Sequence, residues 1–286
     1  MKIIDIITSE RPSLSFEVFP PKTEATYESV RDAALKICEL SPSYMSVTFG
    51  AGGGTSEYTA SICSDILHRG ITPLAHLTCL CLDRERIFKE LTKLKELGVE
   101  NILALRGDIP KDSGLTSQGY SHASELISDI KSFGGFCIGG ACYPEGHPES
   151  PDSYQDIEAL KIKAECGCEF LTTQMFFDNN ILYNFLYRLY RAGVDIPVIA
   201  GVMPVTNASQ IKRLMSIAGS ALPQRFVRIV DRYKDSPEAM KQAGIAFATE
   251  QIVDLYANGI NAVHVYSMNK PDVAAAIAKN LSEIIK

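Results

Sequence analysis

The sequence of 286 residues has no cluster of lysine and arginine and no long apolar run. Its formal net charge is −6, and with no basic helix to offset that charge we expect no nucleic-acid partner. No apolar run approaches the ~20 residues that a helix needs to cross a bilayer, so we expect no membrane partner. The start, Met1 to Asp5, lacks the apolar core and cleavage site of a signal peptide, and the expected compartment is cytoplasmic.

Metal-binding spacings are also scarce. The chain has eight cysteines, and its two close pairs, Cys79/Cys81 and Cys166/Cys168, are each separated by a single residue. Zinc sites usually separate such pairs by two to four residues, so we expect no metal. Disulfides are not expected in a reducing compartment. The cysteines are therefore expected to pack as small apolar core residues.

What the chain does have is a regular alternation of short apolar runs and amphipathic stretches. The apolar runs are rich in β-branched and aromatic residues and are near-continuous, as strands buried on both faces are. We expect strands at residues 14–19, 44–49, 73–79, 101–106, 137–143, 170–176, 197–203 and 262–268.

Helical patterns separate these runs. Residues 83–97 and 179–192 each place their apolar side chains on one face, and Asp83 is positioned to cap the first of these helices. Several helical runs are followed by a glycine, which adopts the left-handed conformation that ends a helix without a Cβ clash. These glycines are Gly70, Gly98, Gly167, Gly193 and Gly259.

Eight strands that alternate with helices predict a parallel sheet, either closed into a barrel or open and doubly wound. A dinucleotide-binding open sheet would carry G-x-G-x-x-G after the first strand, where this chain has Glu17-Val-Phe-Pro-Pro. The glycine-rich segment 50–55 follows the second strand instead and lacks the final glycine. The even spacing favours the α/β class and a (β/α)8 TIM barrel, with residues 1–286 as a single domain.

Polar residues occur where most of the predicted strands end, and the active site of such a barrel lies at those ends. Each has a structural alternative, such as a core histidine, a local Arg106–Asp108 salt bridge, or a metal site made by His147 with Glu145 and Glu149. Metal-dependent barrel hydrolases usually carry H-x-H on the first strand, where this chain has F-E-V. Taken together, the polar residues predict a pocket with one acid–base group. They are Glu17, Thr48, His76, Arg106, Asp108, Tyr143, His147, Gln174, Tyr266 and Asn269.

Glu17 is the candidate for that group, because it lies in the middle of the apolar stretch LSFEVFPP. Strand alternation alone would point it at solvent while its neighbours pack. If it faces a protected site, its apolar neighbours Phe16, Val18 and Phe19 should raise its pKa by desolvation. A carboxyl group of that kind stays protonated near neutral pH and can act as a general acid.

Eight motifs in register connect these residues to a known family. In order they are SFEVFPPKTEA, SVTFGAGG, AHLTC, ILALRGD, YPEGHPE, TTQMFFD, GVMPVTN and HVYSMNK, and the resemblance they carry runs from about residue 12 to 280. In these motifs the chain resembles methylenetetrahydrofolate reductase in its short bacterial form, which is an FAD-binding barrel.

The resemblance implies reduction of 5,10-methylenetetrahydrofolate to 5-methyltetrahydrofolate. In that family NADH or NADPH passes hydride to the flavin and leaves, and the folate then takes its place. An acid protonates folate N10, and the ring opens to an iminium that is reduced. An iron–sulfur protein as electron donor, and a folate- or pterin-binding barrel without redox activity, are the alternatives. We also expect a homo-oligomer.

The family's functional positions transfer to this chain by their motifs. Glu17 matches the acid, and Asp108 matches an aspartate that favours the cationic iminium. The expected folate contacts are Glu17, Thr48, Asp108, Gln174, Gln210 and Lys270. The expected FAD contacts are Thr48, Phe49, Ala51, His76, Arg106, Gly107, Asp108, His122, Ala123, Tyr143, His147, Asp156 and Lys163.

Some positions depart from the family pattern. Ala159 and Ile162 replace an asparagine and an arginine of the FAD-binding helix, and Leu214 replaces a stacking aromatic. Lys270 replaces an arginine near the folate tail and loses its fork of donors. Phe49 and His122 stand where the family has tyrosines. These departures bear on the cofactor and the electron donor more than on the reaction.

Overall fold

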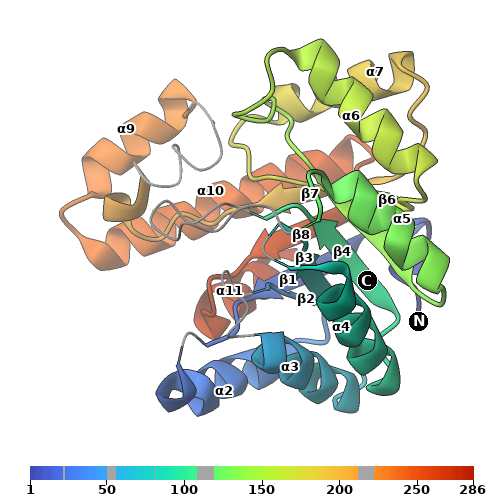
Figure 1. The fold of residues 1–286 in the computed structure, drawn as a ribbon. Coiled ribbons are helices and arrows are strands. Elements are labelled where there is room, and N and C mark those ends of the chain that lie inside the picture. The colour runs from blue at the N-terminus through green and yellow to red at the C-terminus, as the bar shows by residue number, and fades with distance from the viewer. Residues whose placement is uncertain (22, 50–55, 81, 108–118, 212–221) are drawn as a thin grey trace.

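The computed structural model describes residues 1–286 apart from 22, 50–55, 81, 108–118 and 212–221. Eight parallel strands form a closed barrel in chain order, and the first strand pairs with the last, with Ser13 opposite Ala262 (Figure 1). The TIM-barrel prediction is therefore confirmed. The strands are β1 Ser13–Val18, β2 Met45–Val47, β3 Pro73–Thr78, β4 Asn101–Leu105, β5 Cys137–Cys142, β6 Phe170–Thr173, β7 Val198–Val202 and β8 Ala262–Tyr266.

Helices surround the barrel, and α9 lies to one side of it, where Phe226 packs against Phe247 of α10 (Figure 1). Asp83 caps α4 by accepting a hydrogen bond from the Arg86 amide, as its position predicts. In the described part of the chain, no helix combines the length and the apolar character that crossing a bilayer requires. The helices are α1 Ile3–Ile7, α2 Tyr27–Cys38, α3 Ser56–His68, α4 Arg84–Glu96, α5 Ala123–Phe133, α6 Ser153–Glu165, α7 Asn179–Arg191, α9 Gln224–Tyr233, α10 Pro237–Ala257 and α11 Pro271–Leu281, with short 3-10 turns at Glu24–Thr26 and Ala208–Gln210.

Several strands end one to three residues before the expected position. β2 stops at Val47 and β6 at Thr173, although the apolar runs continue to residues 49 and 176. The backbone beyond β2 and β6 still bonds to the neighbouring strand: the Thr48 amide donates to Val18 O at 3.0 Å, and the Gln174 amide donates to Cys142 O at 2.7 Å. The apolar runs therefore continue beyond the strands into the loops at the C-terminal end of the barrel, which form its rim.

Strand alternation divides the first strand into two faces. Leu14, Phe16 and Val18 belong to the large cluster between barrel and helices, whereas Ser15 and Glu17 lie on the opposite, inner face. The N-terminal end of the barrel interior is apolar, and Ile3 and Ile7 of α1 belong to the cluster there. Asn101, the first residue of β4, is a buried polar side chain at this end and accepts from the Ile3 amide at 2.8 Å, whereas Glu17 lies toward the rim.

A close backbone approach fixes α10 against the chain that follows β7. Gly244 is buried, and a Cβ added there would lie 2.0 Å from the carbonyl oxygen of Val205. We expect Gly244→Ala to lower the free energy of unfolding by about 1–3 kcal/mol, because the helix must move away from the loop. Urea denaturation measures this, with the exposed Ala246→Ser on the same helix as control. Equal stability of the two variants would contradict this contact.

Candidate active site

The inner face of β1 places Glu17 opposite Ser46 of β2 on one side and Tyr266 of β8 on the other. Only 6% of Glu17 is exposed. Burial raises the pKa of its carboxyl group from 4.5 to about 8, and a hydrogen bond with Ser46 opposes the rise. Glu17 is therefore mostly protonated at neutral pH, as the sequence predicts.

The reason for this pKa differs from the expected one. Phe16 and Val18 pack outward against the helices, so they are not the groups that desolvate the carboxyl. A strand turns successive side chains to opposite faces, which means that residues adjacent in sequence do not surround each other. The protected environment comes instead from the barrel interior, where Ser46, His76 and Tyr266 lie on neighbouring strands.

His76 of β3 lies beside the acid. Its Nε2 is 3.6 Å from Oε2 of Glu17, too long for a hydrogen bond. Burial lowers the pKa of His76 to about 3, so a neutral imidazole faces a protonated carboxyl group and the two form no ion pair at pH 7. This Nε2 is buried and has no hydrogen-bond partner in the described part of the protein. A ligand at this position could satisfy it.

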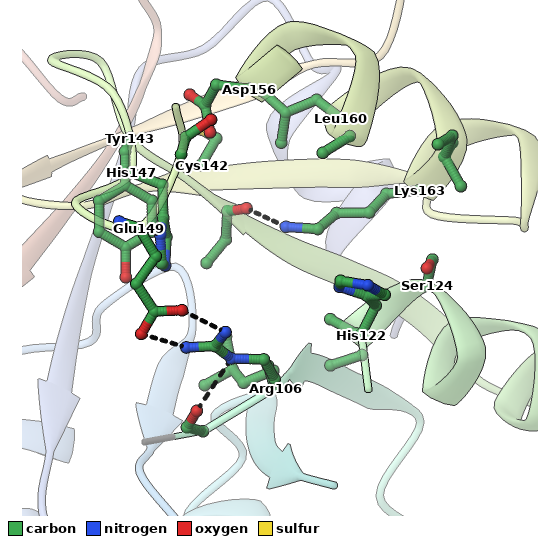
Figure 2. Close-up of a pocket in the computed structure, with 18 residues that line it drawn as sticks. Arg106, His122, Ser124, Cys142, Tyr143, His147, Glu149, Asp156, Leu160 and Lys163 are labelled. Atoms are coloured by element: carbon green, nitrogen blue, oxygen red, sulfur yellow. Dashed lines mark hydrogen bonds and ion pairs between the residues drawn. The ribbon is translucent and has the colours of Figure 1, made fainter. Parts of the chain in front are cut away.

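A pocket of about 460 Å³ opens at the ends of β4 and β5 (Figure 2). This volume falls within the range of small-molecule sites. Residues from α5, α6 and the loop after β5 complete its lining. Eight of the expected FAD contacts line it together: Arg106, Gly107, His122, Ala123, Tyr143, His147, Asp156 and Lys163.

Arg106 spans the pocket to a carboxylate that the sequence did not single out as its partner. Its guanidinium group donates to both oxygens of Glu149, at 2.5 and 2.9 Å (Figure 2). This contact lowers the pKa of Glu149. The backbone amide of Glu149 also donates to Nδ1 of His147, at 3.1 Å, within the loop after β5. Nδ1 of His147 is therefore unprotonated.

The floor of the pocket carries a second cation. Nζ of Lys163 donates to the Ala141 carbonyl at 2.8 Å, and burial lowers the pKa of this lysine (Figure 2). Asp156, about two α-helical turns away on the same face of α6, has a pKa raised by burial. Two cationic side chains and a neutral His147 suit a ligand that bears phosphate groups.

Gly107 also lines this pocket and, having no side chain, exposes only its backbone to it. It has a φ of +85°, and an added Cβ would lie 3.0 Å from Cβ of Thr78. A side chain at this position would be strained and would crowd β3. Ala159 and Ile162, two departures from the family pattern, line the same pocket, so its α6 wall is partly apolar.

The other predicted contacts that the structure describes do not line this pocket. Oε1 of Gln174 accepts from the Met175 amide at 2.9 Å, and Lys270 donates to the Thr206 hydroxyl at 2.8 Å. Phe49 is partly buried, packs against the outer cluster between barrel and helices and does not line this pocket, and its contact with the cofactor stays a prediction. Thr48 is held through its backbone carbonyl by the Thr59 hydroxyl. Ala51, Asp108, Leu214 and the side chain of Gln210 lie outside the described residues.

The sequence did not single out the buried histidine of β8, His264. It lies on the same inner face as Tyr266, and two serine hydroxyls contact its ring. The alternation in His264-Val-Tyr266 is the signal that could have identified it. Of the described cysteines, all but Cys166 are buried, and no cluster of three potential metal ligands occurs among the described residues.

Comparison with known proteins shows which family model and which relatives the chain matches. The family model described as "Methylenetetrahydrofolate reductase" matches residues 2–282. The 5,10-methylenetetrahydrofolate reductases of Pectobacterium carotovorum and Escherichia coli are each 32% identical, over 95% and 94% of this chain and 90% of their own length. Methylenetetrahydrofolate reductase (NADH) 1 of Arabidopsis thaliana is 33% identical over 99% of this chain, which spans about half (51%) of that relative.

Solved structures support the same fold. A Clostridium thermocellum protein described as binding two copies of 5-methyl-5,6,7,8-tetrahydrofolic acid matches with a TM-score of 0.66 and 14% identity over 98% of both chains. A dihydropteroate synthase of Xanthomonas albilineans matches with a TM-score of 0.53 and 13% identity, over 96% of this chain and 93% of its own. At this identity the likeness concerns the barrel alone.

Proposed function

We propose that this chain, which belongs to the methylenetetrahydrofolate reductase family, reduces 5,10-methylenetetrahydrofolate to 5-methyltetrahydrofolate. The observation that carries the proposal is a carboxyl group, Glu17, kept protonated inside the barrel near neutral pH. The bacterial relatives that match over 90% of their length carry the name of this activity. The test is anaerobic: methylenetetrahydrofolate should reoxidise the reduced cofactor of the purified protein.

The proposed role of Glu17 is to protonate folate N10. A protonated carboxyl group gives up its proton to the departing nitrogen and opens the five-membered ring, which leaves a cationic iminium. The neighbouring His76 is neutral, so it does not stabilise the ionised form of Glu17 before the folate arrives. Thr48, Asp108, Gln174, Gln210 and Lys270 are proposed as the folate contacts, and the negative charge of Asp108 would favour the cation.

The proposed cofactor is FAD, held in the pocket between β4, β5 and α6. When bound, it would supply hydride transfer from NADH or NADPH to the folate. The residues present fit such a ligand: Arg106 and Lys163 provide cations for phosphates, and Gly107 lets the backbone approach closely. The guanidinium fork of Arg106 is already paired with Glu149, so a phosphate there must share Arg106 with that carboxylate or displace it.

Lys163→Met is expected to weaken FAD binding about 10–100-fold, because one charge-assisted hydrogen bond is lost while the volume of the side chain is kept. Titration of the apoprotein with FAD, followed by quenching of flavin fluorescence, measures this affinity. Lys161→Met on the same helix, which does not line the pocket, is the matched control. Wild-type protein that stays colourless after incubation with FAD would contradict the cofactor proposal.

A further inference from the structure

The turn after β8, residues 267–270, holds the end of β1, the strand that carries Glu17. The hydroxyl of Ser267, a buried residue, donates to the carbonyl oxygen of Glu17 at 2.6 Å. The side-chain nitrogen of Asn269 donates to the carbonyl oxygen of Phe19 at 3.0 Å, and its Oδ1 accepts from the Phe19 amide at 2.8 Å. Two side chains of one turn therefore fix the backbone at Glu17 and just beyond the end of β1.

These side-chain bonds take over where the backbone pairing of β1 with β8 ends. The last paired residues are Glu17 and Tyr266. Two prolines follow Phe19, and because proline has no N–H the ladder cannot continue beyond this residue. The carboxamide of Asn269 offers an acceptor and a donor, as a peptide group does, so it pairs with Phe19 in place of a strand residue. The closure of the barrel thus extends past Glu17 through side chains, which substitution can remove.

The backbone of this turn is strained. Met268 and Asn269 both have a φ of +54°, in the left-handed region, which asparagine tolerates and methionine rarely adopts. The Lys270 amide closes the turn by donating to the carbonyl oxygen of Ser267 at 3.0 Å. The Met268 side chain packs against the apolar cluster that contains Phe226 of α9. Strain of this kind persists only where the surroundings enforce it, and here it brings the side chains of Ser267 and Asn269 to the same strand end.

The position of a general acid is set by the backbone from which it extends. A carboxyl group must lie within hydrogen-bond reach of the atom that it protonates, and a misplacement of about 1 Å can cost about 10²-fold in rate. On the side of β2, the Thr48 amide holds the carbonyl oxygen of Val18. We propose that Asn269 and Ser267 are positioning residues that hold Glu17 in its protected place from the side of β8. Only their effect on folate reduction rests on the proposed function.

The next residue, Lys270, is one of the proposed folate contacts and has anchors of its own. Its Nζ donates to the Thr206 hydroxyl at 2.8 Å, and its amide makes the bond to Ser267 that closes the turn. Neither bond involves the side chain of Asn269. Removal of the Asn269 carboxamide should therefore displace the acid more than the folate contact, and so lower the limiting rate rather than the affinity for folate.

The first test follows the acid in the apoprotein, without folate. Infrared difference spectra against Glu17→Gln follow the C=O band of protonated Glu17 through a pH titration. In Asn269→Ala the loosened end of β1 should admit water to the carboxyl group, and its pKa should fall from about 8 by about one unit, a tenfold change. Of the described groups, His76, Tyr44 and Tyr266 face this carboxyl group, and burial keeps all three uncharged near neutral pH.

Asn261→Ala is the control, because it removes the same carboxamide at the opposite end of the pairing between β1 and β8. The Asn261 side chain bonds to the carbonyl oxygen of Glu10, and its loss should leave the pKa of Glu17 at about 8. Ser267→Ala should lower this pKa as Asn269→Ala does, and it serves if Asn269→Ala does not fold. An unchanged or raised pKa in either folded variant would overturn the inference.

The second test separates rate from affinity. Asn269→Ala should reduce methylenetetrahydrofolate about 10–100-fold more slowly than the wild type at saturating folate, with KM changed less than about threefold. Reduction of the flavin by the nicotinamide donor should be unchanged, since it does not use the acid. A raised KM at an unchanged limiting rate, or equal slowing of both half-reactions, would overturn the positioning role. If the wild type does not reduce folate, the proposed function fails, and the infrared titration still decides whether Asn269 and Ser267 position Glu17.

Discussion

Glu17→Gln is expected to slow the reduction of methylenetetrahydrofolate about 10²–10⁴-fold, while the nicotinamide donor still reduces the bound flavin at nearly the wild-type rate. Glutamine matches the carboxyl group in size and is neutral, like the protonated acid, but it has no proton to give to N10. The flavin half-reaction needs no such proton. Rapid-mixing measurements of the two half-reactions under anaerobic conditions separate the effects.

The pH dependence supplies an internal control for this prediction. Because the pKa of Glu17 is about 8, the wild-type folate half-reaction should slow as the pH rises through that value. The residual rate of Glu17→Gln should lack this decline. Glu96→Gln, an exposed neutralisation on α4, should behave as wild type. Survival of both half-reactions in Glu17→Gln would exclude it as the acid, and loss of both would indicate damage to the cofactor site.

The sequence was sufficient for the barrel because each strand and helix is encoded locally. Residues 101–106 needed only their own composition to be identified as a strand, and Gly98 marked the preceding helix end without reference to the rest of the chain. Eight such units in even succession leave few topologies. Arg106, Tyr143 and His147 were also predictable, since the ends of parallel strands meet at one rim, whereas His122, Ala123, Asp156 and Lys163 were expected only from the family resemblance.

Contacts that depend on strand register were not predictable. Ser15 and His264 are 249 residues apart and meet only because β1 closes onto β8. The pairing of Arg106 with Glu149 likewise depends on how the loop after β5 folds back over β4. The expected surroundings of Glu17 were wrong for the same reason. Its sequence neighbours Phe16 and Val18 were visible in the sequence, whereas the residues on neighbouring strands that enclose it were not.

A buried acid of this kind has a thermodynamic consequence that does not involve the reaction. Below pH 4.5, Glu17 is protonated in both the folded and the unfolded protein, so its ionisation does not change the free energy of unfolding. Between pH 4.5 and about 8 only the folded protein holds the proton, so the free energy of unfolding must fall as the pH rises. Above pH 8 the loss is complete, and the rise in pKa corresponds to roughly 5 kcal/mol at most.

Glu17→Gln is therefore expected to be more stable than the wild type at pH 9, by up to roughly 5 kcal/mol, and to match it near pH 4.5. His76 and His264, whose pKa values are lowered to about 3, destabilise the folded protein as the pH falls below their ordinary value of 6.5. That loss is common to both proteins and cancels in the difference. Urea denaturation at pH 5, 7 and 9 measures the difference, and a constant value would mean that Glu17 is ionised in the folded barrel.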